Sequence, residues 1–186
     1  MTTPVMNAPA VRAPISVGSA ALYQFPNVGY TSDQSWQSDL TQLMSLLQSG
    51  AVAPSALNIW TSLAPSAPGT SWIDQVQMQV RARGKVYTLN RYGRGGNSTT
   101  LQTLSAAEVK GVTSIDFVGI KNNNGNNVLG QLTFHFGPGV SPRTIGNLGT
   151  SKPTISGTIT PPPNTSLLGF TARTGADVDG LAPIFG

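Results

Sequence analysis

The feature that most constrains the fold is a segment of alternating apolar and polar residues that occurs three times. The copies align without gaps and begin about 50 residues apart. In each copy a turn-type residue, Asp or Gly, directly precedes the alternating run. A period of two is the pattern of a half-buried β-strand, so each copy predicts a strand entered through a turn. The copies are Trp72–Val80, Val128–Phe136 and Asp177–Phe185, with Asp74, Gly130 and Asp179 as turn-type residues.

Repeats of this period indicate similar β units that share one core. Each unit has room for roughly four strands, too few to fold alone. A propeller blade can have this period, but three blades cannot close a ring. The repeat therefore predicts an all-β chain built as a three-sided prism with pseudo-threefold symmetry. Glycine-rich loops follow the first two copies, at Tyr92–Asn97 and Ile145–Gly149.

Composition supports this fold class. Charged residues make up 10% of the chain, against roughly 25% in an average globular domain, and Gly, Ser, Thr, Asn and Pro take their place. The absence of Cys excludes disulfides and thiolate metal sites, and no cofactor is expected. Residues 1–10 do not resemble a signal peptide, and no run of about 18 apolar residues could span a membrane. We therefore expect a cytoplasmic or non-classically released protein.

The sequence predicts a single domain over residues 1–186. Residues 32–70 should form a helix and a loop insertion. A helix is predicted at about 33–48, because its apolar residues share one stripe. Residues 51–70 should be mostly loop, because they hold three prolines, the first at Pro54, and many small residues. Lacking Lys and Arg, the helix should pack on the domain or on a partner subunit rather than on lipid. Its stripe contains Trp36, Leu40, Leu43, Met44 and Leu47, and its polar side contains Ser38, Asp39, Thr41 and Ser45.

The other expected elements are short strands and turns. Residues 1–31 should supply one or two strands before a turn at 26–29, and residues 71–186 contain the prism repeats. The tract Asn122–Asn127 is predicted to be a turn, because Asn and Gly tolerate positive φ. The expected strands are Ala13–Val17, Ala21–Phe25, Ile115–Lys121, Leu129–Phe136 and Thr154–Thr160.

A family resemblance supports the prism. Residues Leu168–Leu181 read L-G-F-T-A-R-T-G-A-D-V-D-G-L, which resembles the G-F-x-G-R-x-G-x-x-x-D-x-[IL] pattern of the jacalin-related lectins. Ile73–Met78, followed by Gly95-Gly96, resembles an earlier repeat of the family, so the resemblance covers residues from about 70 to 186. It implies the β-prism I fold, three Greek-key sheets of four strands each. Part of residues 1–31 should then complete one sheet beside the C-terminal strand, with the helix as an insertion.

The same resemblance implies a carbohydrate site between two loops. A carboxylate accepts two charge-assisted hydrogen bonds from sugar hydroxyls, and glycines let backbone N–H groups approach. An isolated G-x-x-x-D usually only closes a turn, but the repeat favours a site at Asp179. By position, Asp179 is the carboxylate and Gly175 opens the motif. Backbone N–H groups would come from Ala176, Asp177 and Val178, and the glycine-rich partner loop from Gly18.

A second carbohydrate site is predicted at the first repeat. Asp74 would be its carboxylate, with Gly95 and Gly96 as the glycine loop and Trp72 stacking on a sugar face. The remaining repeat has Gly130 in place of the Asp and is not expected to bind.

Three other functional classes fit the sequence less well. An enzyme with a Ser/His/Asp triad would have to use His135, the single His, and no nucleophile-elbow motif is present. An acid–base carboxylate pair could only be Asp177 and Asp179, which lie on opposite sides of a strand start. Nucleic acid or another polyanion could bind a basic patch at Arg81–Arg94, where Arg81, Arg83 and Lys85 alternate, although such a stripe is usually a solvated strand face. An Ala/Pro-rich N-terminus would also suit a capsid-like assembly protein. We therefore predict a non-catalytic lectin for mannose- or glucose-type glycans that forms a homodimer or larger homo-oligomer.

Overall fold

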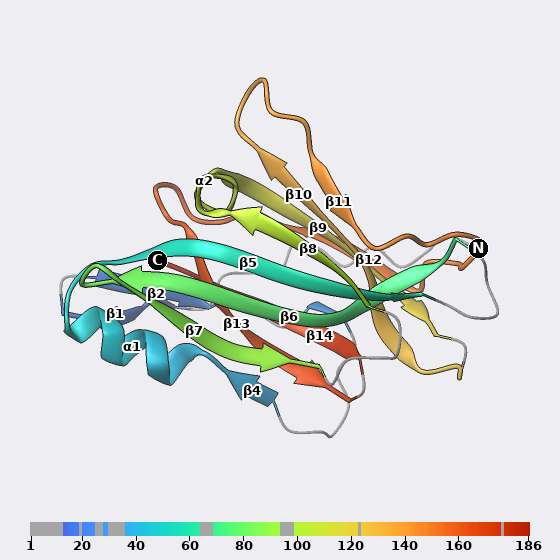
Figure 1. Ribbon diagram of the computed structural model, residues 1–186, viewed down its shortest axis with the longest axis horizontal. Helices are drawn as coiled ribbons and strands as arrows, with labels where there is room; N and C mark the ends of the chain where they lie inside the picture. Colours follow the sequence, from blue (N-terminus) through green and yellow to red (C-terminus); the bar gives the residue numbers. More distant parts are fainter. Residues whose placement is uncertain are drawn as a thin grey trace.

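The computed structural model describes residues 13–18, 20–24, 28–29, 36–63, 69–93, 99–122, 124–175 and 177–186. These residues form antiparallel sheets and two short helices (Figure 1). Several predictions fall outside the described residues, namely those for Gly95, Gly96, Arg94, Ala176, residues 25–27 and the first residues of the helix at 33–35.

The strands form three sheets. One sheet has the order β7-β6-β5-β8 and contains β5 (Val52–Leu63), β6 (Ser71–Ala82), β7 (Lys85–Tyr92) and β8 (Thr99–Ser105). A second has the order β11-β10-β9-β12 and contains β9 (Val112–Lys121), β10 (Asn127–Phe136), β11 (Arg143–Ile145) and β12 (Ile155–Ile159). The third has the order β1-β2-β14-β13-β4, with β3 also beside β14, and contains β1 (Ile15–Val17), β2 (Ala20–Gln24), β3 (Val28–Gly29), β4 (Trp36–Ser38), β13 (Leu167–Thr174) and β14 (Val178–Phe185).

Each sheet is built on a central hairpin, β5–β6, β9–β10 or β13–β14. The second strand of each hairpin is one copy of the sequence repeat. In the third sheet, β2 and β3 come from the beginning of the described chain and pair with β14 near its end. This repetition confirms the all-β, pseudo-threefold prism.

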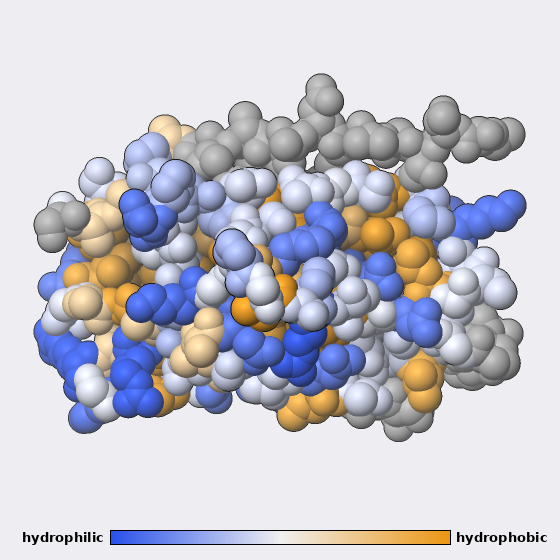
Figure 2. Space-filling model, turned by 90° about the horizontal axis from the view of Figure 1, so that it is seen from above, coloured by the Kyte–Doolittle hydropathy of each residue, from blue (hydrophilic) through white to orange (hydrophobic). Residues whose placement is uncertain are grey.

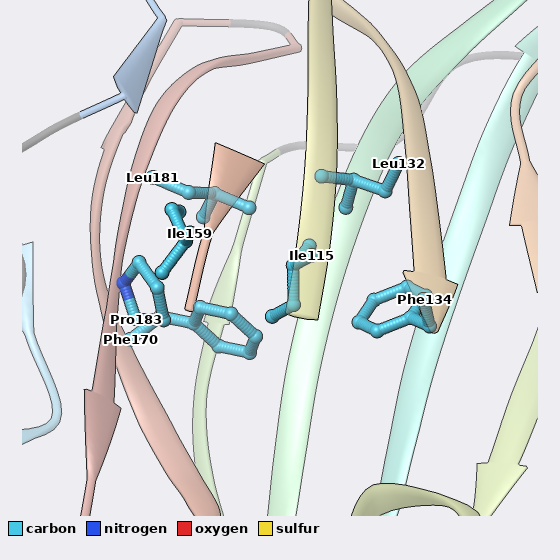
Figure 3. A pocket seen from close by; sticks show the side chains of 7 residues that line it. All are labelled: Ile115, Leu132, Phe134, Ile159, Phe170, Leu181 and Pro183. Atoms are coloured by element: carbon cyan, nitrogen blue, oxygen red, sulfur yellow. The ribbon is translucent and has the colours of Figure 1, made fainter. Parts of the chain in front are cut away.

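The inward faces of the three sheets share one apolar core. Alternating repeat residues supply much of it, such as Val76 and Met78 from β6 and Phe134 from β10. Figure 3 shows side chains of the second and third sheets around a small apolar cavity of about 10 Å³. A space of this size is at the lower limit for one water and offers it no polar partner, so it is a packing gap rather than a ligand pocket. Its lining is Ile115, Leu132, Phe134, Ile159, Phe170, Leu181 and Pro183.

The prediction of a loop over residues 51–70 is wrong for its first part. Val52–Leu63 is a 12-residue strand at the centre of its sheet, paired with β6 and β8. Leu57 and Ile59 are fully buried in the core. Pro54, which suggested a loop, lies at a register shift, where the missing N–H of proline is tolerated.

The helix is shorter than predicted. Helix α1 runs over Leu40–Gln48, because Trp36–Ser38 forms β4 beside β13. Its apolar stripe packs on the domain, with Leu43 fully buried and Met44 partly buried against the core. In the described part of the chain, neither helix has the length and hydrophobicity needed to cross a bilayer.

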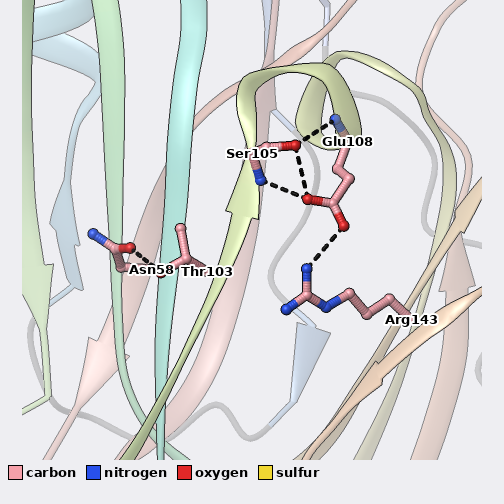
Figure 4. A network of polar contacts seen from close by, with 5 residues as sticks. All are labelled: Asn58, Thr103, Ser105, Glu108 and Arg143. Atoms are coloured by element: carbon pink, nitrogen blue, oxygen red, sulfur yellow. Dashed lines mark hydrogen bonds and ion pairs between the residues drawn. The ribbon is translucent and has the colours of Figure 1, made fainter.

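A second helix, α2 (Ala106–Lys110), was not predicted. Ser105 and Glu108 form a capping box at its start, and the free oxygen of Glu108 accepts from Arg143 at 2.8 Å (Figure 4). The backbone N–H and hydroxyl of Ser105, followed by Arg143, hold the pKa of Glu108 below its usual value. The single Glu of the chain therefore joins α2 to β11.

Asp39 lies on the polar side of the predicted helix but is fully buried. Its carboxylate accepts hydrogen bonds from the Tyr92 hydroxyl at 2.8 Å and from the backbone N–H groups of Phe170 (3.0 Å) and Asn90 (3.1 Å). Burial raises the pKa of Asp39, and these hydrogen bonds oppose the rise. Asp39 thus links the start of α1 to β7 and β13.

Replacing Asp39 by Asn is expected to lower the free energy of unfolding by about 2 kcal/mol. The new amide group must face the N–H of Phe170, which leaves a buried donor without an acceptor. Urea unfolding measures the change. Asp116→Asn is the matched control, because the Asp116 side chain is 40% exposed, and it should cost less than about 1 kcal/mol. Equal losses for the two variants would contradict the structural role of Asp39.

Candidate functional site

Asp74, Gly130 and Asp179 occupy the same place in the three sheets. In each central hairpin the strand register skips this residue, so each is the extra residue of a β-bulge. A bulge bends the strand and redirects the side chain, and bulges are common beside functional sites. The turn-type residue of the sequence repeat is therefore a bulge residue at the entrance of β6, β10 or β14.

Asp179 lies where the β13–β14 loop enters β14. Its side chain is 14% exposed, and its Oδ2 lies 3.7 Å from Nη2 of Arg173. Burial raises the pKa of Asp179; the Arg173 guanidinium counteracts the rise and the Asp177 carboxylate adds to it. A Cβ at Gly175 would lie 3.7 Å from Asp179 Oδ2, so this glycine brings the loop backbone close to the carboxylate. The structure thus joins Gly175 and Asp179 as predicted by their spacing.

Asp177 in the same loop has its own partners. Its Oδ1 accepts from Nε1 of Trp72 at 2.8 Å, and its Oδ2 accepts from Nδ2 of Asn122 at 3.3 Å. The carbonyl of Asp177 also accepts from the N–H of Gly175 at 3.1 Å. Val178, the next residue, is fully buried, so it fixes the strand start rather than offering its side chain to a ligand.

The structure does not bring Gly18 to this loop. Gly18 follows β1, and β2 pairs with β14 at Tyr23–Gln24, near the C-terminal end of β14. Asp179 is at the other end of this strand, roughly 20 Å away at the usual rise per residue. The glycine beside the Asp179 bulge is Gly29 in β3, which is opposite Gly180.

Gly29 could have been found from the sequence. An apolar–Gly pair, Tyr92-Gly93, lies opposite the equivalent strand of the first sheet, and Ile145-Gly146 does so in the second. Val28-Gly29 is the third such pair, but it precedes its unit in the chain instead of following it. Glycine is required at the first two places, since a Cβ on Gly93 would lie 1.9 Å from the carbonyl oxygen of Asp74, and a Cβ on Gly146 would lie 2.2 Å from that of Gly130.

The structure does not place an open second site at Asp74. Asp74 is 1% exposed and Trp72 is 8% exposed, so the carboxylate cannot reach solvent hydroxyls and the indole offers no free face for stacking. Trp72 instead donates to Asp177, which makes it part of the first site. The burial of both side chains disfavours the predicted second site.

The basic segment does not form one strand face. A tight turn at Arg83–Gly84 separates β6 from β7. Arg83 Nε donates to the carbonyl of Ser49 at the end of α1 (2.7 Å), and the guanidinium of Arg91 lies 4.1 Å from the Trp60 ring centroid. These two arginines have structural contacts, which weakens the polyanion interpretation.

The residues weighed for catalysis also have other partners. His135 Nε2 and Asp116 Oδ2 are 2.7 Å apart on β10 and β9, and Thr158 donates to the other Asp116 oxygen. This hydroxyl is bonded to the carboxylate instead of the imidazole, so no nucleophile–base pair forms. Among the described residues, no three His, Cys, Asp or Glu side chains gather as a metal site would require.

Comparisons with known proteins agree on the architecture. No protein-family model matches the sequence, and neither does any curated protein. Solved structures do match. A mannose-binding jacalin-related lectin from Ananas comosus superposes with a TM-score of 0.60 at 18% identity, over 88% of this chain and 96% of the lectin. The fold is that of the jacalin-related lectins.

Two further structures with the jacalin-related fold cover similar lengths. A mannose-specific jacalin-related lectin from Morus nigra, solved in complex with mannose, has a TM-score of 0.60 at 15% identity, over 92% of this chain and 99% of the lectin. Malaysian banana lectin has a TM-score of 0.58 at 16% identity, over 88% and 96%. The near-complete coverage means that the prism itself, with all three sheets, is shared.

Proposed function

We propose that this protein is a non-catalytic lectin that binds mannose- or glucose-type sugars at the Gly175–Asp179 loop, with Gly29 as the neighbouring glycine. One observation carries the proposal: Asp179 is a bulge carboxylate, partly exposed, with glycine backbone on both sides. The carboxylate accepts hydrogen bonds from two neighbouring sugar hydroxyls. Backbone N–H groups of the loop donate to the hydroxyl oxygens of the sugar. A side chain in place of the glycine would keep the sugar too far from these N–H groups.

The structural neighbours support the sugar class. The lectin from Ananas comosus is mannose-binding, and that from Morus nigra is mannose-specific and was solved with mannose. Burial raises the pKa of Asp179, and the Arg173 guanidinium beside it opposes this rise by favouring the charged carboxylate.

Binding of a single sugar should be weak. A millimolar Kd corresponds to only about 4 kcal/mol, so useful avidity needs several sites, which homo-oligomers provide.

The face in Figure 2 is mostly hydrophilic, with hydrophobic residues in separate patches. Among the described residues, the large exposed apolar side chains are Leu63 on β5, Val86 on β7, Leu101 on β8 and Val140 between β10 and β11.

Retention on immobilised mannose tests the proposal. The protein should be retained and should elute with free methyl α-mannoside but not with methyl β-galactoside at the same concentration. A glycan array then gives the preferred glycan. If the folded protein binds no glycan on the array, the lectin function is wrong; if salt rather than sugar elutes it, polyanion binding replaces it.

Glycan affinity is expected to fall on acidification at a higher pH than an exposed Asp would cause. Burial raises the pKa of Asp179 above its ordinary value, and a protonated carboxyl loses its charge-assisted bonds. Arg173→Met removes the charge that lowers this pKa, so the variant should lose affinity at a still higher pH than the wild type. Titrating affinity between pH 7 and 4 measures both curves, and superimposable curves would contradict the pairing of Arg173 with Asp179.

A further inference from the structure

Three segments far apart in the sequence meet at the carboxylate of Asp177. Trp72 stands at the start of β6, Asn122 follows the end of β9, and Asp177 lies between β13 and β14. Each carboxylate oxygen has a different donor, the indole N–H of Trp72 and the amide of Asn122. All three sheets of the prism therefore contribute to holding one loop residue.

The orientation of the Asn122 amide is fixed by its own turn. Its Oδ1 accepts from the backbone N–H groups of Asn124 and Asn126, each at 3.0 Å. The Asn122 N–H donates to the Asn126 carbonyl at 2.8 Å. Since the oxygen is engaged inside the turn, the NH₂ group must point outward, and it points to Asp177. The predicted Asn-rich turn thus presents a donor to the neighbouring loop.

The Trp72 indole is held just as firmly. Its ring is 8% exposed and packs with Ile120 and Val128 in a small apolar cluster. An indole N–H can only donate, and a buried one needs an acceptor. Asp177 Oδ1 at 2.8 Å is that acceptor.

We propose that Trp72 and Asn122 are positioning residues that hold the Gly175–Asp179 loop in its carbohydrate-binding shape by fixing the side chain of Asp177. This rests on the lectin function proposed above. The Asp177 carbonyl bonds the N–H of Gly175, so a fixed Asp177 also fixes the turn that leads to Asp179. Preorganisation of a loop removes an ordering cost from binding. A loop that is in its binding shape one-tenth of the time has an apparent Kd about tenfold higher.

Three variants and one control test this proposal. Trp72→Phe keeps an aromatic ring but removes the donor. Asn122→Asp keeps the acceptor for its own turn but places a carboxylate opposite Asp177. Each should raise the Kd for methyl α-mannoside about tenfold. The double variant Asn122→Asp/Asp177→Asn reverses the donor and acceptor and should recover most of the wild-type affinity. Asn58→Asp is the control, because Asn58 bonds Thr103 on the outer face of β5 and β8 and should keep full affinity (Figure 4).

Thermal unfolding of every variant separates positioning from folding. Reduced affinity in folded variants, together with recovery in the double variant, supports the proposal. It is overturned if the folded single variants bind like the wild type, or if the double variant binds no better than Asn122→Asp. A wild-type protein that binds no glycan would instead remove the proposed lectin function, and this outcome is seen before any variant is made.

Discussion

Replacing Asp179 by Asn is expected to weaken glycan binding about 100-fold or more, which puts monosaccharide binding out of reach of detection. Two charge-assisted hydrogen bonds at about 1.5 kcal/mol each account for this factor. An amide keeps one acceptor oxygen but presents an NH₂ group to the second sugar hydroxyl. The protein should stay folded, since Asn has nearly the same shape as Asp and a carboxylate charge penalised by burial is removed. Isothermal titration with methyl α-mannoside and array binding measure the loss.

The matched control for Asp179→Asn is Asp116→Asn on the outer face of the second sheet. Asp116 contacts His135 and Thr158 and no part of the β13–β14 loop in the described structure. Asp116→Asn removes the same charge as Asp179→Asn. If Asp116→Asn binds glycans fully, the loss of binding in Asp179→Asn comes from the site and not from the change in net charge. An Asp179→Asn protein that binds as well as the wild type would show that the site lies elsewhere.

Replacing Gly93 by Ala is expected to lower the free energy of unfolding by about 4 kcal/mol. Gly93 has φ +89, and an added Cβ would lie 1.9 Å from the carbonyl oxygen of Asp74. Both atoms belong to the backbone, so relief requires β6 and β7 to separate at the bulge. Urea unfolding, monitored by tryptophan fluorescence, measures the loss.

Gly84→Ala separates the effect of the clash from the effect of positive φ. Gly84 has φ +73 in the β6–β7 turn, but nothing lies within 4 Å of its added Cβ. It should cost only about 1 kcal/mol. If both variants lose the same stability, the close contact between Gly93 and the bulge carbonyl is not what demands glycine there.

The parts of the fold that follow from local patterns could be predicted from the sequence. The alternation in the three repeats identified the second strands of all three hairpins, and the Asp or Gly ahead of each proved to be a bulge residue. Strand β5 was missed because Pro54 suggested a loop, although Leu57 and Ile59 already alternate with polar Asn58. The loop propensity of Pro54 is outweighed by the pairing of β5 with its two neighbouring strands, β6 and β8.

The residues of the candidate site that are close in sequence were predicted. The residue that reaches the site through long-range strand pairing was not. Gly175 and Asp179 lie four residues apart, so their spacing alone brings them together. Gly29 reaches the site because β3 pairs with β14, and its apolar–Gly pair was missed because it precedes its unit in the chain instead of following it. Trp72 was assigned to a second site at Asp74, since a sequence cannot show that its indole donates to Asp177 in another unit. Asp39 was assigned to a helix surface because its burial is created by β7 and β13.

The pairing of β3 with β14 has a consequence for biosynthesis. Gly29 is translated well before Gly180, its partner. The sheets around β5–β6 and β9–β10 can assemble during translation, but β3 must wait until β14 has been made, and such non-local pairing is slow. The proposed sugar site therefore forms only when the third sheet is complete. Sugar binding would then indicate completed folding, and nascent or truncated chains would not bind glycans.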